Sequence, residues 1–304
     1  MYNKGWEFGI TANPFRGKDF SWSSTLNITT NKNEVTSLAP GLTEILSATS
    51  GLETVSRTAV GYSLGYLWLV RNGGVDPSTG SRILLNKTGA PVLYRFAPNA
   101  ALGQFQWSNP DGTQYKENGV AVAVTQAKDG VMYGNTSPKV YGGWDNTFRY
   151  KEFDLNVLLT YQFGFYVYYG SNAGLHDQRF WNNAVDVLTA WKKPGDVTTV
   201  PRPVYGDNVS NGSGLPMSYN AFKGDFVKLK NLTLSYNFST KLISKAKMSS
   251  ARIFVSGQNL AIITDYPGPD PEVSSNGNAN TSQGIDRNTI ANGRAFVIGI
   301  NIGF

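Results

Sequence analysis

The residues of this sequence that are best suited to chemistry are the carboxylates of the segment DYPGPDPEV, residues 265–273. Asp265, Asp270 and Glu272 lie close together there, and Asp286 follows a few residues later. Closely spaced carboxylates can bind calcium, and a pair held at a set separation can hydrolyse a glycosidic bond. The segment lacks a full EF-hand pattern, and its alternating prolines favour a rigid turn. We prefer the turn, with metal binding and carboxylate catalysis as the alternatives.

The rest of the composition offers little catalytic chemistry. The chain has no cysteine and a single histidine, His176, so disulfides, thiolate nucleophiles and multi-histidine metal sites are excluded. The segment GVDPSTG, residues 74–80, has turn residues in Asp76, Pro77 and Gly80 but no phosphate-loop context. Lysines and arginines give a net charge of +6 but are scattered, so we expect no nucleic-acid partner. We expect no catalytic residue, metal or cofactor.

The elements that position these residues are expected to be β-strands. In FDLNVLLTYQFGFYV, residues 153–167, apolar side chains from Phe153 onward alternate with mostly polar ones from Asp154 onward. This period of two is that of a strand with one apolar and one polar face, and its length would cross a bilayer at barrel tilt. The sequence contains no run of about 18 apolar residues, so it predicts no membrane-spanning helix. The same pattern predicts seven strands, at residues 4–14, 18–30, 139–150, 153–168, 224–238, 250–263 and 294–304.

The connections between these strands alternate between short and long. Residues 15–17, 151–152 and 239–249 form the short links, and residues 31–138, 169–223 and 264–293 form the long ones. Short periplasmic turns and long extracellular loops are typical of outer-membrane barrels. The pattern therefore predicts an all-β fold: a transmembrane antiparallel β-barrel segment with long extracellular loops. Within the second loop, helical spacing of Phe180, Val187 and Trp191 predicts one short helix over residues 175–193.

Several motifs in chain order resemble one family. They are NKGWEF, GVDPSTG, SPKVYGGWDNTFRYKEFDLNVLLTYQFG, the run from GDFVKLKNL through PGPDPEV, GID, and the terminal RAFVIGINIGF. Together they resemble the C-terminal part of the SusC/RagA family of TonB-linked outer-membrane transporters, over nearly the whole chain.

The resemblance implies a 22-stranded barrel with an N-terminal plug, a SusD-like surface lipoprotein as partner, and TonB as the energy source. It implies import of glycans, oligosaccharides or peptides in Bacteroidota, without enzymatic activity. Residues 1–304 would hold the last seven strands, so we expect a fragment whose plug, upstream strands and signal peptide lie outside it.

The resemblance also implies roles for individual residues. Gly299, Ile302 and Phe304 match the terminal-strand signal read by the barrel assembly machinery, although Val297 replaces the usual polar residue. Asp270, Pro271 and Glu272 form a loop motif of the family. For the substrate path, we expect side chains that can stack on or hydrogen-bond a ligand: Trp107, Asn156, Gln162, Tyr166, Asn231, Asn237, Phe254 and Gln258.

Two other interpretations remain open. One is a different outer-membrane barrel, such as a passive porin or an adhesin. The other is a secreted, soluble carbohydrate-binding or hydrolytic β-protein. The soluble protein would require a second sheet packed against the apolar strand faces, whereas a barrel wall would leave those faces in contact with lipid.

Overall fold

The architecture is dominated by one long antiparallel sheet. The computed structural model describes residues 1–49, 53–179, 181–277 and 279–304. The sheet has seven strands in the order β1-β2-β13-β14-β17-β18-β20, so each strand pairs with its neighbours within this set. The strands are β1 (Tyr2–Arg16), β2 (Phe20–Glu34), β13 (Val140–Tyr150), β14 (Phe153–Phe163), β17 (Phe226–Asn237), β18 (Ser250–Thr264) and β20 (Ala295–Gly303).

The seven strands predicted from alternation coincide with these seven, with one correction. The fourth strand does not continue to residue 168. It ends at Phe163, Gly164 takes a left-handed conformation with φ of 79°, and β15 (Tyr166–Tyr169) begins in another sheet. Alternation continues through both strands, so it did not reveal the break. The glycine between them did carry the signal, because a glycine within a strand often marks a change of direction.

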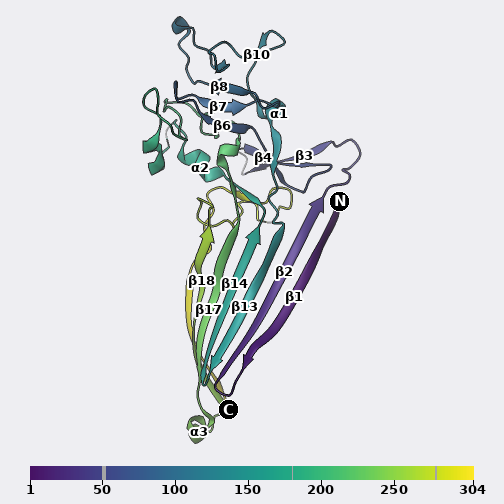
Figure 1. The fold of residues 1–304 in the computed structure, drawn as a ribbon, viewed down its shortest axis with the longest axis vertical. Helices are drawn as coiled ribbons and strands as arrows, with labels where there is room; N and C mark the ends of the chain where they lie inside the picture. Colours follow the sequence, from purple (N-terminus) through teal and green to yellow (C-terminus); the bar gives the residue numbers. More distant parts are fainter. Residues whose placement is uncertain (50–52, 180, 278) are drawn as a thin grey trace.

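All the short connections lie at one end of the sheet and all the long ones at the other (Figure 1). The tightest is a two-residue turn at Lys151, which has φ of 52° and lies between the paired residues Tyr150 and Phe153. The link between β17 and β18 holds α3 (Thr240–Ile243) and η4 (Ser244–Ala246). The N-terminus lies at the end with the long connections and the C-terminus at the opposite end (Figure 1).

The long connections are folded rather than irregular. One four-stranded sheet, in the order β12-β5-β4-β3, consists of β3 (Glu44–Thr49), β4 (Glu53–Ala59), β5 (Tyr66–Leu69) and β12 (Val131–Gly134). A second, in the order β6-β7-β8-β9, consists of β6 (Arg71–Val75), β7 (Arg82–Leu85), β8 (Pro91–Tyr94) and β9 (Trp107–Ser108). The remaining elements are β10 (Lys116–Glu117), β11 (Val120–Ala121), β16 (Ala221–Lys223), β19 (Ile285–Asp286), α1 (Gln126–Asp129), α2 (Gly170–Leu175), η1 (Ala100–Leu102), η2 (Val185–Thr189) and η3 (Ser218–Asn220).

One buried core joins all three long connections. Val55 and Leu67 from the first connection pack with Tyr168 from the second and Ile285 from the third, and each is fully buried. β15 pairs in parallel with β19 through Tyr168 and Ile285. Because this apolar cluster contains residues from each connection, the three segments fold as one body above the sheet (Figure 1).

The predicted helix over residues 175–193 is wrong. α2 ends at Leu175, and the described residues of the segment that follows contain only the 3-10 turn η2. The buried Asp177 carboxylate accepts hydrogen bonds from the backbone and side chain of Arg179, and the Trp191 indole donates to the Pro77 carbonyl at 2.8 Å. Such local polar bonds and tertiary contacts compete with helix formation. Phe180, part of the predicted apolar face, lies outside the described residues. Within the described ranges, the helices are all too short or too polar to cross a membrane.

Candidate functional site: the polar face of the sheet and the loop above it

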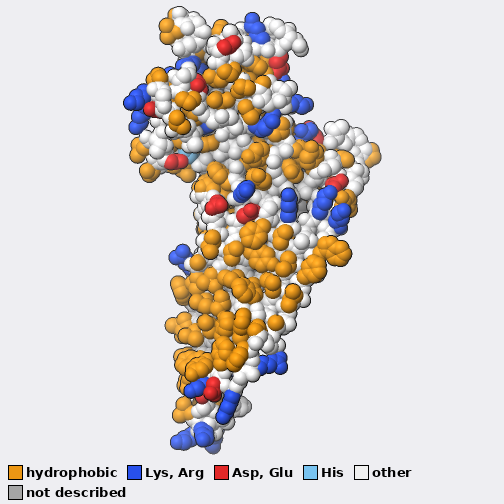
Figure 2. Space-filling model, in the orientation of Figure 1, with side chains coloured by type: hydrophobic (Ala, Val, Ile, Leu, Met, Phe, Trp, Pro, Cys, Tyr) orange, Lys and Arg blue, Asp and Glu red, His pale blue; other side chains and the backbone are white. Residues whose placement is uncertain are grey.

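The two faces of the seven-stranded sheet differ sharply in chemistry. On one face, large apolar side chains are exposed, and Figure 2 shows them as a continuous band over the sheet. Trp6 on β1 is 72% exposed, and Phe296 and Ile298 on β20 are each 73% exposed. We call this the apolar face. Alternation places Asp145, Asn156, Asn231 and Arg252 on the opposite side, which we call the polar face.

Three predicted substrate-path residues take part in hydrogen bonds across the polar face. The Asn156 amide donates to Asp145 at 2.9 Å and to Thr147 at 3.1 Å. The Asn237 amide donates to Asp154 at 2.8 Å, and Arg149 donates to the same carboxylate at 2.7 Å.

The third of these residues, Asn231, accepts at its side-chain oxygen from Ser256 at 2.9 Å and Thr233 at 3.2 Å. These bonds satisfy the polar groups across neighbouring strands. They also fix the orientation of the amides, so the polar face presents a defined pattern of donors and acceptors.

Gln258, Gln162 and Phe254 lie on or at the end of the same face without joining that network. Gln258 is exposed on β18 opposite Asn231. Gln162 is near the end of β14 and lines a cavity described below. The Phe254 ring lies over its cross-strand partner Gly299, where an added Cβ would be 2.4 Å from the ring Cζ. The two glutamine side chains are therefore the freer hydrogen-bonding groups of this face.

The loop motif Asp270-Pro271-Glu272 is held against the sheet by a lysine. The Lys228 ammonium, on β17, lies 3.0 Å from each oxygen of Asp270 and also forms an ion pair with Glu272. Asn292 donates a further hydrogen bond to Asp270 at 3.1 Å. Lys228 and Asp270 are 3% and 4% exposed. Buried charges need such pairing, so this cluster fixes the position of the loop over residues 264–293.

The same loop is tied to the folded body by two further contacts. The Tyr266 hydroxyl donates to Asp286 at 2.7 Å, and Arg287 forms an ion pair with Glu53. Burial, together with the hydrogen bond to Asp286, raises the pKa of Tyr266, so the phenol keeps its proton. Burial likewise raises the pKa of Glu53, although Arg287 opposes that shift. Three of the four carboxylates that suggested metal or sugar chemistry, Asp270, Glu272 and Asp286, therefore bind side chains of the protein itself.

A cavity of about 330 Å³ lies between the end of β14 and this loop. Its lining includes Gln162, Phe165, Glu272, Ser274 and Gln283. The Ser274 hydroxyl is buried and has no hydrogen-bond partner among the described residues. The cavity thus combines an aromatic ring, amides, a hydroxyl and one carboxylate, a set suited to binding a polar ligand. The fold brings Gln162, which was predicted for the substrate path, next to Pro271 and Glu272 of the predicted loop motif.

Two predicted residues lie elsewhere. Trp107 is in β9, and its ring centroid is 4.7 Å from that of Tyr94 in the core of the first long connection. Tyr166 begins β15, and its ring packs edge-on against Tyr133 with centroids 5.6 Å apart. Both rings lie in the folded body above the sheet and apart from the polar-face network.

The residue that sequence reasoning missed is Lys228. Its signal was present, because Lys228 lies on the polar side of the alternating strand FVKLKNLTLSYN, at the end nearest a loop rich in carboxylates. A lysine at such a position needs an acidic partner once it is buried. Glu53 and Arg287 carried no comparable signal, because 234 residues separate them. Over the described ranges, acidic and histidine side chains do not gather in threes at any place suited to a metal ion.

No family model matches this chain. It is 29% identical to TonB-dependent receptor P3 of Formosa agariphila over 100% of this chain, and 25% identical to TonB-dependent receptor SusC of Bacteroides thetaiotaomicron over 100% of this chain. The solved structure of the RagAB peptide transporter aligns with a TM-score of 0.73 at 19% identity, over 99% of this chain and 29% of that one.

The SusC/RagA resemblance is confirmed. The alignment with the RagAB structure covers nearly the whole chain, so it includes both the sheet and the folded body. The chain spans 29% of the length of receptor P3 and 26% of the length of SusC. These relatives are receptors and transporters, which agrees with the expectation of a non-enzyme.

Proposed function

We propose that residues 1–304 form the C-terminal barrel wall and external loops of a TonB-energised outer-membrane importer. The observation that carries the proposal is the exposed apolar face of a seven-stranded meander, in a chain similar throughout to TonB-dependent receptors. A soluble protein would bury such a face, whereas lipid covers it in a barrel.

The open edges of the sheet fit this arrangement. Among the described residues, β1 and β20 each pair with a strand on one side only. In the proposed barrel of 22 strands, strands outside residues 1–304 pair with both edges and close the wall. The plug and the segment that contacts TonB also lie outside these residues. Gly299, Ile302 and Phe304 in the last strand are recognised by the barrel assembly machinery.

The polar face then lines the lumen, and the folded body lies on the extracellular side. Asn156, Gln162, Asn231, Asn237, Phe254 and Gln258 line the substrate path, with Tyr166 and Trp107 in the external body above it. A SusD-like lipoprotein covers that body from outside. Amide side chains can form hydrogen bonds with the hydroxyls of an oligosaccharide and with the amides of a peptide, so either class is a proposed cargo.

Uptake by the intact outer-membrane protein that contains these residues tests the proposal. Cells carrying it are given fluorescent oligosaccharides or fluorescent peptides, in matched strains with and without TonB. We expect one cargo class to enter only when TonB is present. Equal uptake in both strains would contradict the proposal and favour a passive porin, and the absence of heat-modifiable migration in gels would contradict the barrel itself.

A further inference from the structure

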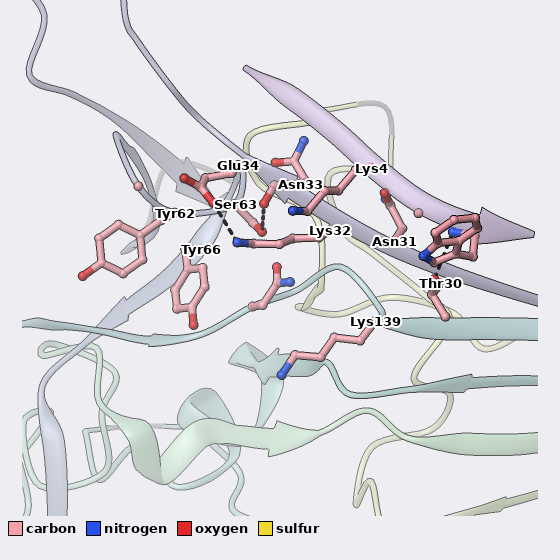
Figure 3. A pocket seen from close by; sticks show the side chains of 14 residues that line it. Lys4, Thr30, Asn31, Lys32, Asn33, Glu34, Tyr62, Ser63, Tyr66 and Lys139 are labelled. Atoms are coloured by element: carbon pink, nitrogen blue, oxygen red, sulfur yellow. Dashed lines mark hydrogen bonds and ion pairs between the residues drawn. The ribbon is translucent and has the colours of Figure 1, made fainter.

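A basic pocket lies where β2 separates from β13. Pairing between these strands ends at Thr30 and Val140, whereas β2 continues to Glu34. The gap holds a cavity of about 810 Å³, lined by lysines from three segments: Lys4 on β1, Lys32 on β2, and Lys139 just before β13. Figure 3 shows Lys32 and Lys139 on opposite sides of this space, with Tyr62 and Tyr66 along it. We call it the fork pocket.

Positive charge in the fork pocket is only partly neutralised. Among the residues that the structure describes, Glu34 is the one acidic residue in its lining; it lies 2.9 Å from Lys32 and accepts a hydrogen bond from Tyr2 at 2.8 Å. The Lys4 ammonium lies 5.8 Å from the Tyr2 ring. Among the described residues, the Lys139 ammonium has neither an ion pair nor a hydrogen bond. Two positive charges are left over, which suits a ligand with a doubly charged anionic group.

The fork pocket adjoins the apolar face. Lys4 and Lys32 are cross-strand partners two residues beyond the pair Trp6 and Thr30, so alternation places them on the same face as Trp6. Trp6 itself lines the pocket, and Phe8 continues the exposed apolar row below it at 56% exposure. Figure 2 shows blue side chains gathered just above the orange band over the upper ends of β1 and β2.

We propose that the fork pocket binds the phosphate group of a membrane lipid. The inference rests on the proposed barrel, in which the apolar face meets acyl chains and the lysines lie at headgroup depth. Lysine ammonium groups bind phosphate as point charges, and basic side chains between membrane-spanning elements bind lipid headgroups. Trp6 contacts the upper part of the acyl chain, as aromatic rings do at membrane boundaries. The lipid, rather than a soluble anion, is favoured because the pocket continues into an apolar surface.

The test uses the intact outer-membrane protein in detergent, with dioleoyl phosphatidic acid and dioleoyl phosphatidylcholine as probes in native mass spectrometry. In Lys32→Gln/Lys139→Gln, we expect affinity for phosphatidic acid to fall about thirtyfold, whereas phosphatidylcholine binding stays the same. Lys18→Gln/Lys116→Gln removes the same charge far from the pocket and is the matched control. If the double variant does not fold, Lys139→Gln alone breaks no ion pair and is expected to weaken binding about fivefold.

The outcomes distinguish a lipid phosphate from a soluble anion, and they distinguish failure of the lipid site from failure of the proposed barrel. Unchanged affinity for phosphatidic acid in the pocket variants, or an equal loss in the control, would overturn the site. Displacement of phosphatidic acid by equimolar inorganic phosphate would also overturn it, since the ligand would then be a soluble anion. A protein that shows heat-modifiable migration but retains no phosphatidic acid would refute the lipid site alone. A protein without such migration would refute the barrel and the site together.

Discussion

The ring of Phe254 covers the backbone of Gly299, its cross-strand partner on the polar face. The nearest ring atom lies 2.4 Å from the place a Cβ would occupy at position 299, so only glycine leaves room for the ring there. One of these residues was expected in the substrate path and the other in the terminal-strand signal. Their contact links packing of the last strand to the shape of the polar face.

Gly299→Ala is therefore expected to displace the Phe254 ring and to destabilise the folded protein by about 1–3 kcal/mol. The loss is measured by urea unfolding of the intact protein, followed by gel migration. Phe254→Ala/Gly299→Ala should recover part of it, because the smaller side chain at 254 removes the clash. If the double variant assembles no better than Gly299→Ala, the glycine acts through recognition of the strand rather than through the ring.

Lys228→Met should release the loop over residues 264–293. It leaves the buried Asp270 carboxylate without its cation, a change that costs about 3–5 kcal/mol at buried pairs. We expect faster amide exchange and faster proteolysis within the loop. Lys230→Met is the matched control, because Lys230 is more exposed and lies 3.4 Å from Glu272. Equal effects of the two substitutions would show that the Lys228 pair does not hold the loop.

Acidification should loosen the segment around Asp177. Burial raises the pKa of this carboxyl, but hydrogen bonds from Arg179 and Ser213 outweigh burial and bring it below its ordinary value of 3.8. A depressed folded-state pKa contributes stability above that ordinary value, and the contribution is lost as pH falls through the folded pKa. Amide exchange at Arg179 should therefore accelerate at the acid end of a titration from about pH 6 to about pH 3. Asp177→Asn should remove most of this pH dependence; an unchanged profile in that variant would assign it to other groups.

Gln162→Ala and Gln258→Ala should weaken uptake without unfolding the protein. Neither side chain takes part in the hydrogen-bond network of the polar face, so stability should change little, while each lost ligand hydrogen bond lowers affinity roughly two- to tenfold. The measurement is the concentration dependence of uptake for the cargo class that TonB energises. Gln114→Ala, in the external body, is the control. Full uptake by both polar-face variants would remove these residues from the substrate path.

Residues 1–304 expressed alone should not transport. Among the described residues, β1 and β20 each have an unpaired edge whose backbone groups cannot be satisfied in lipid, and the proposed plug lies outside residues 1–304. Cells carrying only this polypeptide should take up no more labelled cargo than cells with an empty vector. Uptake above that level would contradict the proposal that transport requires parts of the importer outside residues 1–304.

The sequence by itself determined the large sheet, because alternation of side chains is a local property that every strand carries. Trp6, Phe153 and Phe296 could be assigned to one face from their spacing, and the contrast between short and long connections predicted which ends of the strands lie together. The same local signal failed at Gly164, where alternation continued through a break, and over residues 175–193, where tertiary contacts replaced a helix.

Only the tertiary structure decided the partners of the charged groups and the form of the long connections. Lys228 meets Asp270, and Arg287 meets Glu53, because hydrophobic packing of Val55, Tyr168 and Ile285 brings distant segments into one body. Each contact depends on where two separate segments lie in space, and no periodicity in the chain encodes that distance. For this reason the strands could be predicted from the sequence, whereas the loop anchor and the fork pocket could not.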